Sequence, residues 1–307
     1  MATNITVSSN YAGTDAGAII GKAFKEADTI ARNLVTVLPD VDFQTSLRLI
    51  SYSDGRQDYS CGFTPQGAVT LSEKLLTPKK IKNELEICKE DLRQIWSSAT
   101  MGFSAHNDSM PKDVETALLA EILADEAQAT DAAIWQGSAT NGTFPGFIGL
   151  WGSDASIIKA GSGITSLNAA ITSSNVLAEM AKVKEAIPVT LRRKNLVFAV
   201  SPDVADAYDT ALIAAGTSNG LGGNANTQQN YGRYTVETVN GLPDNTFVVY
   251  EVKNLYFGTG LLADHNEVRI KDMDESDLSG QVRYKMVYTA GVQYANSTEI
   301  VWYLSTT

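Results

Sequence analysis

Long segments of alternating apolar and polar residues constrain the fold of this chain most. Residues 43–49 place Phe, Thr and Leu at every second position, which is the pattern of a strand with one buried face. The alternation resumes over residues 69–75 and again over 81–87, after a polar stretch at 53–68 that contains several glycines. The pattern predicts a long two-stranded hairpin with a flexible tip that runs into a core strand.

One long helix follows these strands. Residues 111–136 carry the strongest helix pattern in the chain, with Pro111 in the first turn and Gly137 as the stop. At about 1.5 Å per residue, a helix of ~26 residues is roughly 39 Å long. A helix of that length beside a long hairpin predicts an elongated arrangement of these elements.

The second half of the chain mixes shorter helices and strands, so the fold class is predicted to be α+β. Helices are predicted over residues 174–187 and 201–212, on either side of a buried strand over 196–200. A loop rich in Gly, Asn and Gln covers residues 216–232. Further strands are predicted over residues 235–239, 247–252, 282–288 and 300–304. A helix with one apolar face is also predicted near the N-terminus, from Asp15 to Ala31.

Charge and composition exclude several classes of protein. A protein with a formal net charge of −11 is unsuited to binding nucleic acid, because neutralising the phosphates requires clustered Lys and Arg. Cys61 and Cys88 are predicted to be free thiols, with a single disulfide between them as the alternative. His106 and His265 are too few for a zinc site. The sequence shows neither a signal-peptide pattern nor a membrane-spanning stretch, so we expect synthesis in the cytoplasm.

One short pattern matches a catalytic motif. Residues 216–220 read Gly-Thr-Ser-Asn-Gly, the nucleophile pattern of serine hydrolases, and Ser218 is followed downstream by Asp244 and His265. That motif requires a strand before the serine and a helix after it, whereas an Ala-rich helical segment precedes this serine. We therefore predict a flexible loop, no enzyme activity, and no catalytic, cofactor-binding or metal-binding residues. A hydrolase that uses Ser218 is kept as an alternative.

Two charged clusters are interpreted as solvated surface. The acidic cluster consists of Asp272, Asp274, Glu275 and Asp277. It lacks the glycine and the terminal glutamate of a calcium loop, which favours a turn over a cation site. The basic run at residues 192–194 precedes a strand and fits a solvated cluster better than a binding patch. Separately, the scattered tryptophans indicate core or interface anchors: Trp96, Trp135, Trp151 and Trp302.

Four stretches and the order of the elements resemble one known family. They are KNELEICK (82–89), LVFAVSPDVADA (196–207), VETVNGLPDNTFVVYEVKNLYFGTGLL (236–262) and VRYKMVYTAGVQYANSTEIVWY (282–303). The chain resembles the major capsid proteins of tailed bacteriophages, which have the Hong Kong 97-type fold. The resemblance covers nearly the whole chain, as an order of elements with weak local patterns.

The resemblance implies a division of the chain into named parts. These are an N-terminal arm and helix (1–40), an extended-loop hairpin (41–80), a peripheral domain (81–150) with the spine helix at 111–136, an axial domain (151–280), and C-terminal strands (281–307) that return to the peripheral domain. The loop at 216–232 would then lie at the tip of the axial domain, near the centre of a capsomer.

The resemblance also implies a function. It indicates a virion protein without cofactors that assembles, as pentamers and hexamers, into an icosahedral shell enclosing phage DNA. Scaffold, portal and decoration proteins are the other partners it implies, without a membrane and without sequence-specific DNA binding. The negative charge would keep packaged DNA from adhering. The alternatives are an encapsulin-like nanocompartment shell, a phage tail-tube protein and the hydrolase named above.

Opposite charges on the hairpin and the long helix suggest a contact between neighbouring subunits. The basic residues of the hairpin region are Arg48, Arg56, Lys74, Lys79, Lys80 and Lys82. The acidic residues of the helix are Asp113, Glu115, Glu121, Asp125, Glu126 and Asp131. In the family, the extended loop lies across an adjacent subunit, which would bring the two sets together. Mere solubility is the alternative explanation, because an exposed ion pair contributes only about 0.2–1 kcal/mol.

Overall fold

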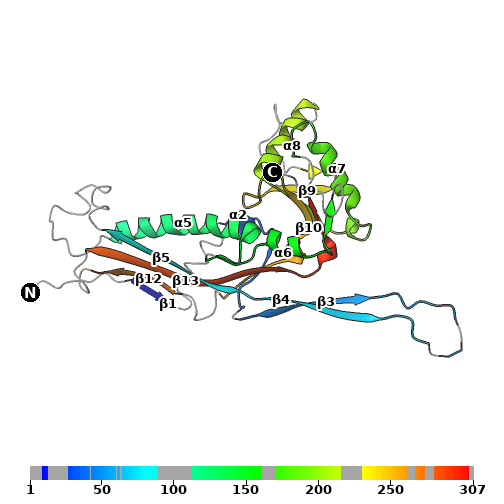
Figure 1. Cartoon of the computed structure of the whole chain (residues 1–307), viewed down its shortest axis with the longest axis horizontal. Coiled ribbons are helices and arrows are strands. Elements are labelled where there is room, and N and C mark those ends of the chain that lie inside the picture. The colour runs from blue at the N-terminus through cyan, green and yellow to red at the C-terminus, as the bar shows by residue number, and fades with distance from the viewer. Residues whose placement is uncertain are drawn as a thin grey trace, which may run out of the picture.

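The computed structural model describes residues 9–12, 27–41, 43–59, 61–62, 64–88, 112–140, 142–160, 170–215, 230–260, 267–273 and 280–303. Over these residues the molecule is elongated, with a long helix above long strands, a lobe that rises from them, and a hairpin that projects from one end (Figure 1). Most of the predicted helix from Asp15 and residues 216–229 of the predicted loop lie outside the described residues.

The longest strand organises the first sheet. That sheet consists of β1 (Ser9–Ala12), β2 (Thr36–Leu38), β5 (Lys79–Cys88), β11 (Leu255–Thr259), β12 (Glu267–Asp272) and β13 (Gln281–Tyr294). β13 has 14 residues and pairs antiparallel with β5, β12 and β11. Its Tyr284, Met286 and Tyr288 are buried, as alternation along a strand requires.

The long helix α5 (Lys112–Gln136) covers this sheet. Its Ile122 and Ile134 join the core made by β5 and β13. Its Glu126 accepts hydrogen bonds from Asn83 Nδ2 on β5, at 2.9 Å, and from the Tyr288 hydroxyl on β13. These contacts hold the helix along the sheet instead of across it (Figure 1).

The lobe contains the second sheet. Its strands, in spatial order, are β6 (Ile158–Ala160), β14 (Ile300–Tyr303), β10 (Phe247–Glu251), β7 (Leu196–Val200), β9 (Tyr234–Thr238) and β8 (Asn230–Tyr231). On β7, Phe198 and Val200 pack against α7 (Val176–Ala186) and α8 (Pro202–Ala214), while Ala199 faces the core shared with the first sheet. The sheet is therefore buried on both faces, which explains its nearly continuous apolar sequence.

An aromatic cluster joins the lobe to the first sheet. It contains Trp135 of α5, Phe147 and Trp151 of α6 (Phe147–Ser153), and Tyr250 of β10, with ring centroids 5.5–6.2 Å apart in the contacting pairs. Trp135 Nε1 donates to Thr29 Oγ1 of α2 (Asp28–Ala31) at 2.8 Å. Every ring in this cluster is fully buried, so the two halves of the molecule share one apolar junction.

The approach of α6 to α5 requires glycine. A Cβ atom on Gly146 would lie 2.5 Å from the backbone nitrogen of Gly137 and 2.6 Å from the carbonyl oxygen of Trp135. Gly146 N donates to Gly137 O at 2.7 Å, which closes the turn between the two helices. No helix was predicted here from the sequence, because the glycines and the short length of α6 hide the helical period.

Most predicted elements are confirmed. The hairpin is β3 (Thr45–Tyr52) and β4 (Val69–Leu76), the long helix is α5, and the strand–helix pair at 196–212 is β7 and α8. The described residues also form three short 3-10 helices: η1 (Leu191–Arg193), η3 (Val252–Asn254) and η4 (Ser297–Glu299).

The pairing of the late strands differs from the division into peripheral and axial domains that the resemblance implied. Residues 151–280 were assigned to one unit, yet β11 and β12 belong to the first sheet with β13. The resemblance assigned residues 281–307 to the peripheral domain, and these residues divide: β13 lies in the first sheet, whereas β14 pairs with β10 and β6 in the lobe. Alternation identifies a strand but carries no information about its partner, which explains both differences.

Candidate assembly surface

The hairpin projects beyond the body of the molecule (Figure 1). β3 and β4 form a two-stranded antiparallel sheet in which Ile50 pairs with Leu71 and Tyr52 pairs with Val69. Partners in an antiparallel pair point to the same face, and so do residues two positions apart. The register therefore gathers these apolar side chains on one face of the hairpin.

That face is exposed. Ile50 is 67% exposed and Leu71 is 69% exposed, and Tyr52, Val69 and Leu75 are exposed as well. We call Ile50, Tyr52, Val69, Leu71 and Leu75 the hairpin stripe. A two-stranded sheet has no second layer of its own to cover such a stripe. Ile50, Tyr52, Val69 and Leu71 are contiguous, and the exposed pair Arg48–Glu73 separates Leu75 from them. Contiguous exposed apolar side chains mark a contact surface for another protein chain.

The tip of the hairpin is polar and equally exposed. Ser53 N donates to Ala68 O at 2.9 Å, and Gln57 Nε2 donates to Thr64 O at 2.8 Å. Arg56 forms an ion pair with Asp54 inside the tip, at 2.5 Å. Among the described residues of the tip, the two sides thus hold each other through polar contacts.

The base of the hairpin is fixed to the body by packing. Leu76 is 1% exposed and lies against Gly258 of β11, where an added Cβ would come within 2.6 Å of Leu76 Cδ2. Leu47, on the same face as Leu76, is buried too. Gln293 Nε2 of β13 donates to the carbonyl oxygen of Leu75 at 2.9 Å. The hairpin is therefore buried at its base and exposed along the rest of its length.

A polar cluster also fixes the base. Lys74 Nζ lies 3.0 Å from Asp154 Oδ2 and 3.5 Å from the centre of the Tyr294 ring. The Tyr294 hydroxyl donates to the same carboxylate oxygen at 2.7 Å, and Ser156 N donates to Asp154 Oδ1 at 2.8 Å. This cluster joins β4, the end of α6 and β13, and we call it the base anchor.

The base anchor favours an ionised Asp154. Burial acts to raise the pKa of this carboxyl, but hydrogen bonds from Tyr294, Ser156 and Lys74 outweigh it and hold the pKa well below its usual range. Burial and the bond to Asp154 raise the pKa of Tyr294, so its phenol stays protonated and donates.

Replacing Asp154 by Asn is expected to lower the free energy of unfolding at pH 7 by about 1–2 kcal/mol, because charge-assisted hydrogen bonds are lost. The pKa of Asp154 is lower in the folded chain than its unfolded value of about 3.9, so its contribution is complete above that value and is lost as the pH falls toward the folded pKa. Urea denaturation should therefore show a smaller difference between parent and variant at pH 3 than at pH 7. Asp40→Asn, at an exposed carboxyl, is the control, and an equal pH-dependent difference there would contradict this assignment.

The basic residues of the hairpin region are partly paired within the chain. Lys74 belongs to the base anchor, and Lys79 Nζ donates to the carbonyl oxygens of Ala139 and Thr143 at 2.8 and 2.9 Å. Lys82 pairs with Glu84 at 2.7 Å. These lysines therefore have partners in their own chain, whereas Arg48 and Lys80 are simply exposed.

The acidic residues of α5 divide in the same way. Asp131 is buried and accepts a hydrogen bond from Thr29 N at 2.9 Å, and Glu126 bonds to β5 and β13 as described above. Burial raises the pKa of Asp131, against the lowering effect of its bonds to Thr29. Glu121 and Asp125 are exposed. Only a few charged residues therefore remain for the predicted contact between the hairpin of one subunit and the long helix of its neighbour. That contact stays a prediction.

The catalytic alternative gains no support. Ser218 and His265 lie outside the described residues, and Asp244 is exposed. The chain ahead of the motif is helix α8, where a serine nucleophile of this type needs a strand. Across the part of the chain that is described, no group of three or more His, Cys, Asp or Glu side chains is placed to hold a metal ion.

The remaining predicted positions are dispersed. Asp272 is buried in β12, and residues 274–279 of the acidic cluster lie outside the described residues. Lys194 pairs with Glu251 and Glu299 at 2.7 and 2.8 Å. Trp135, Trp151 and Trp302 are core residues, while Trp96 is not described.

Cys61 and Cys88 are both exposed free thiols. No helix among the described residues combines the length and apolar character needed to cross a membrane.

Comparison with known proteins identifies the fold through solved structures. No protein-family model matches the chain, and no curated protein matches it either. The capsid of a native GTA particle matches with a TM-score of 0.62 and 14% identity, over 100% of this chain and 95% of that one. A chain of the satellite phage P4 procapsid matches with a TM-score of 0.59 and 11% identity, over 94% and 99%.

A third match comes from an archaeal source. A virus-like particle from Pyrococcus furiosus matches with a TM-score of 0.52 and 10% identity, over 95% of this chain and 98% of that chain. The three solved structures are all particles or capsids, and each match spans nearly the whole of both chains. The chain therefore has the predicted α+β capsid fold, with its projecting hairpin and long helix.

Proposed function

We propose that this chain is a major capsid protein of a tailed bacteriophage, a structural and non-enzymatic subunit that assembles into the icosahedral shell around the phage DNA. The observation that carries the proposal is the hairpin stripe, which projects from the body with its apolar side chains exposed. A monomer that stayed alone would leave this surface in water. A shell in which each hairpin lies on a neighbouring copy would bury it.

Burial of the hairpin stripe would contribute a substantial part of the free energy of assembly. Burial of one Ile, Leu or Val side chain contributes about 1.5–3 kcal/mol. The stripe contains several such side chains on one face, and the contact recurs for every copy in the shell. Since the hairpin of one copy lies on a different surface of the next, the contact is heterologous, and heterologous contacts that close by rotation form rings. Pentamers and hexamers are such rings.

We assign the named parts of the fold accordingly. The first sheet with α5 is the peripheral domain and carries the spine helix, and the second sheet with α7 and α8 is the axial domain. The loop at 216–232 would then lie near the capsomer axis. Scaffold, portal and decoration proteins are proposed as the other partners, and DNA as the enclosed content, held without sequence-specific contacts because the chain has a net charge of −11.

Negative-stain electron microscopy of the purified chain tests the proposal. We expect closed shells or capsomer rings, and an elongated free subunit whose radius of gyration exceeds the ~19 Å of a compact monomer of this length. A compact monomer at every concentration, with no larger assemblies, would contradict the proposal. Shells that contain a cargo enzyme in place of DNA would instead identify an encapsulin-like compartment, which shares the shell architecture.

A further inference from the structure

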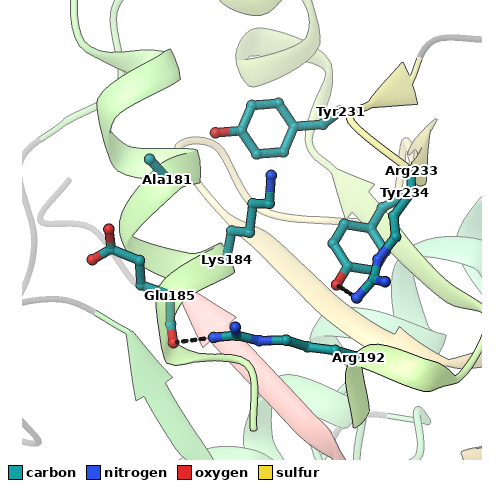
Figure 2. A pocket seen from close by; sticks show the side chains of 7 residues that line it. All are labelled: Ala181, Lys184, Glu185, Arg192, Tyr231, Arg233 and Tyr234. Atoms are coloured by element: carbon teal, nitrogen blue, oxygen red, sulfur yellow. Dashed lines mark hydrogen bonds between the residues drawn. The ribbon is translucent and has the colours of Figure 1, made fainter. Parts of the chain in front are cut away.

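A pocket with a volume of about 620 Å³ opens in the lobe, on the second sheet. It lies between the C-terminal part of α7, η1 and the turn that joins β8 to β9 (Figure 2). The side chains that matter for its chemistry are Lys184, Glu185, Arg192, Tyr231, Arg233 and Tyr234. Its volume is in the range of pockets that bind small molecules, about 300–1,000 Å³.

A tight turn forms one wall of the pocket. Tyr231 of β8 pairs with Tyr234 of β9, which leaves Gly232 and Arg233 as the turn. Gly232 has a φ of +67°, a conformation that favours glycine, and a Cβ there would lie 3.5 Å from Lys184 Nζ. The glycine therefore permits the turn through its backbone conformation, and the Lys184 ammonium group lies beside it.

The arginines are held in place by neutral groups. Arg192 donates from Nε to Ile187 O at 3.0 Å and from Nη2 to Glu185 O at 3.3 Å, and Arg233 Nη2 donates to the Tyr234 hydroxyl at 2.9 Å. Neutral acceptors orient a guanidinium without neutralising its charge. The Glu185 carboxylate points away from both arginines (Figure 2). The pocket thus keeps a net positive charge within a chain that is acidic overall.

The two tyrosines favour an oxyanion over an aromatic ligand. Lys184 Nζ lies 5.4 Å from the centre of the Tyr231 ring, and Arg233 Cζ lies 5.0 Å from that of Tyr234, so cations already occupy the ring faces. Burial, and next the charge of Glu185, raise the pKa of Tyr231, which keeps its hydroxyl protonated near neutral pH. That hydroxyl is available to donate to an anionic oxygen.

We propose that this pocket binds a phosphate-class anion with two or more negative charges, either a free diphosphate or the backbone of a nucleic acid strand. Arg guanidinium groups match the geometry of phosphate oxygens, and several cations around one cavity suit a ligand with more charge than a single carboxylate. The proposal goes beyond shell assembly and does not depend on it.

Calorimetric titration of the full chain with sodium pyrophosphate at ~0.15 M salt tests the proposal. We expect saturable binding that weakens roughly ten-fold or more in Arg192→Gln and in Arg233→Gln, because each removes a charge-assisted hydrogen bond. Arg193→Gln is the matched control, since Arg193 is exposed next to Arg192 but does not line the pocket. It should bind pyrophosphate like the parent. Circular dichroism verifies that all variants are folded.

A competition experiment separates the two sources of phosphate. Displacement of pyrophosphate by a short oligothymidylate, with the same loss in the two pocket variants, would assign the pocket to a nucleic acid backbone. Binding of pyrophosphate without displacement would assign it to a free anion. The proposal is overturned by absence of pyrophosphate binding, by an equal loss in Arg193→Gln, or by tighter binding of a hexaglutamate peptide. Light scattering of shells is a separate readout, so failure here leaves the assembly proposal untouched.

Discussion

Replacing Ile50 and Leu71 together by Asp is expected to abolish shell assembly while the subunit still folds. The two residues are cross-strand partners in the hairpin stripe, 67% and 69% exposed, so the free subunit loses little packing. In an assembled contact, the loss of two such side chains removes at least about 3 kcal/mol for each copy. Burying two carboxylates at the same place adds a further cost. Light scattering and negative-stain electron microscopy measure assembly, and circular dichroism verifies the fold.

The matched control places the same charges on the opposite face of the hairpin. Ser51 and Thr70 are cross-strand partners in the adjacent register position, and both are exposed. Ser51→Asp with Thr70→Asp is expected to assemble like the parent at ~0.15 M salt, where exposed charges are screened. If both double variants fail, added charge and not the stripe is responsible. Normal shells from the Ile50 and Leu71 variant would show that the stripe is not the contact surface.

Replacing Trp135 by Ala is expected to lower the free energy of unfolding by about 4–6 kcal/mol, the largest effect of any single change considered for this chain. Removal of a fully buried indole costs about 3–5 kcal/mol through lost burial and the cavity left behind. The Thr29 hydroxyl also loses its donor, which adds about 1 kcal/mol. Because Trp135 contacts both Phe147 and Tyr250, the loss weakens the junction between the lobe and the first sheet.

Trp135→Phe separates the two causes. A phenyl ring keeps most of the apolar contacts but cannot donate to Thr29, so we expect a loss of about 1–2 kcal/mol. Chemical denaturation monitored by circular dichroism measures both variants. If Trp135→Ala unfolds within about 1 kcal/mol of the parent, the aromatic junction does not hold the two halves together in the way its burial indicates.

The parts of this fold that could be predicted from the sequence are those with strong periodicity. The hairpin strands alternate in polarity, and the pair β7–α8 is an apolar run followed by a helix with one apolar face. The exception is α5, because its apolar residues are not confined to one face. It could be predicted from its long run of helix-forming residues and from Pro111 and Gly137 at its ends.

Only the β4 half of the hairpin stripe is contained in the predicted alternation, through Val69, Leu71 and Leu75. On β3 the alternation marks Leu47 and Leu49, which lie on the face opposite to Ile50 and Tyr52. The composition of the hairpin stripe followed only from the register between Ile50 and Leu71.

The base anchor and the pairing of the late strands could not be predicted. Lys74, Asp154 and Tyr294 are separated by 80 and 140 residues in the sequence, and no local pattern connects them. The phosphate pocket was missed for a similar reason. The basic run at 192–194 was read as one solvated cluster, but Lys194 turns toward Glu251 and Glu299 while Arg192 lines the pocket. Only the tertiary contacts of these side chains separate the two neighbours: Arg192 bonds to the carbonyl oxygens of Glu185 and Ile187, and Lys194 pairs with carboxylates.

The continuity of β4 and β5 has a mechanical consequence. Only Thr77 and Pro78 separate the two strands, and β5 then pairs with β13 over ten positions, from Lys79 opposite Ala290 to Cys88 opposite Gln281. The hairpin and this ladder run in nearly the same direction (Figure 1). A pull on the hairpin therefore loads the ladder in shear, so that its hydrogen bonds resist together and cannot open one after another from an end. In a container made of such subunits, internal pressure would place β4, β5 and β13 under tension. These strands would then be the part of each subunit that resists stretching.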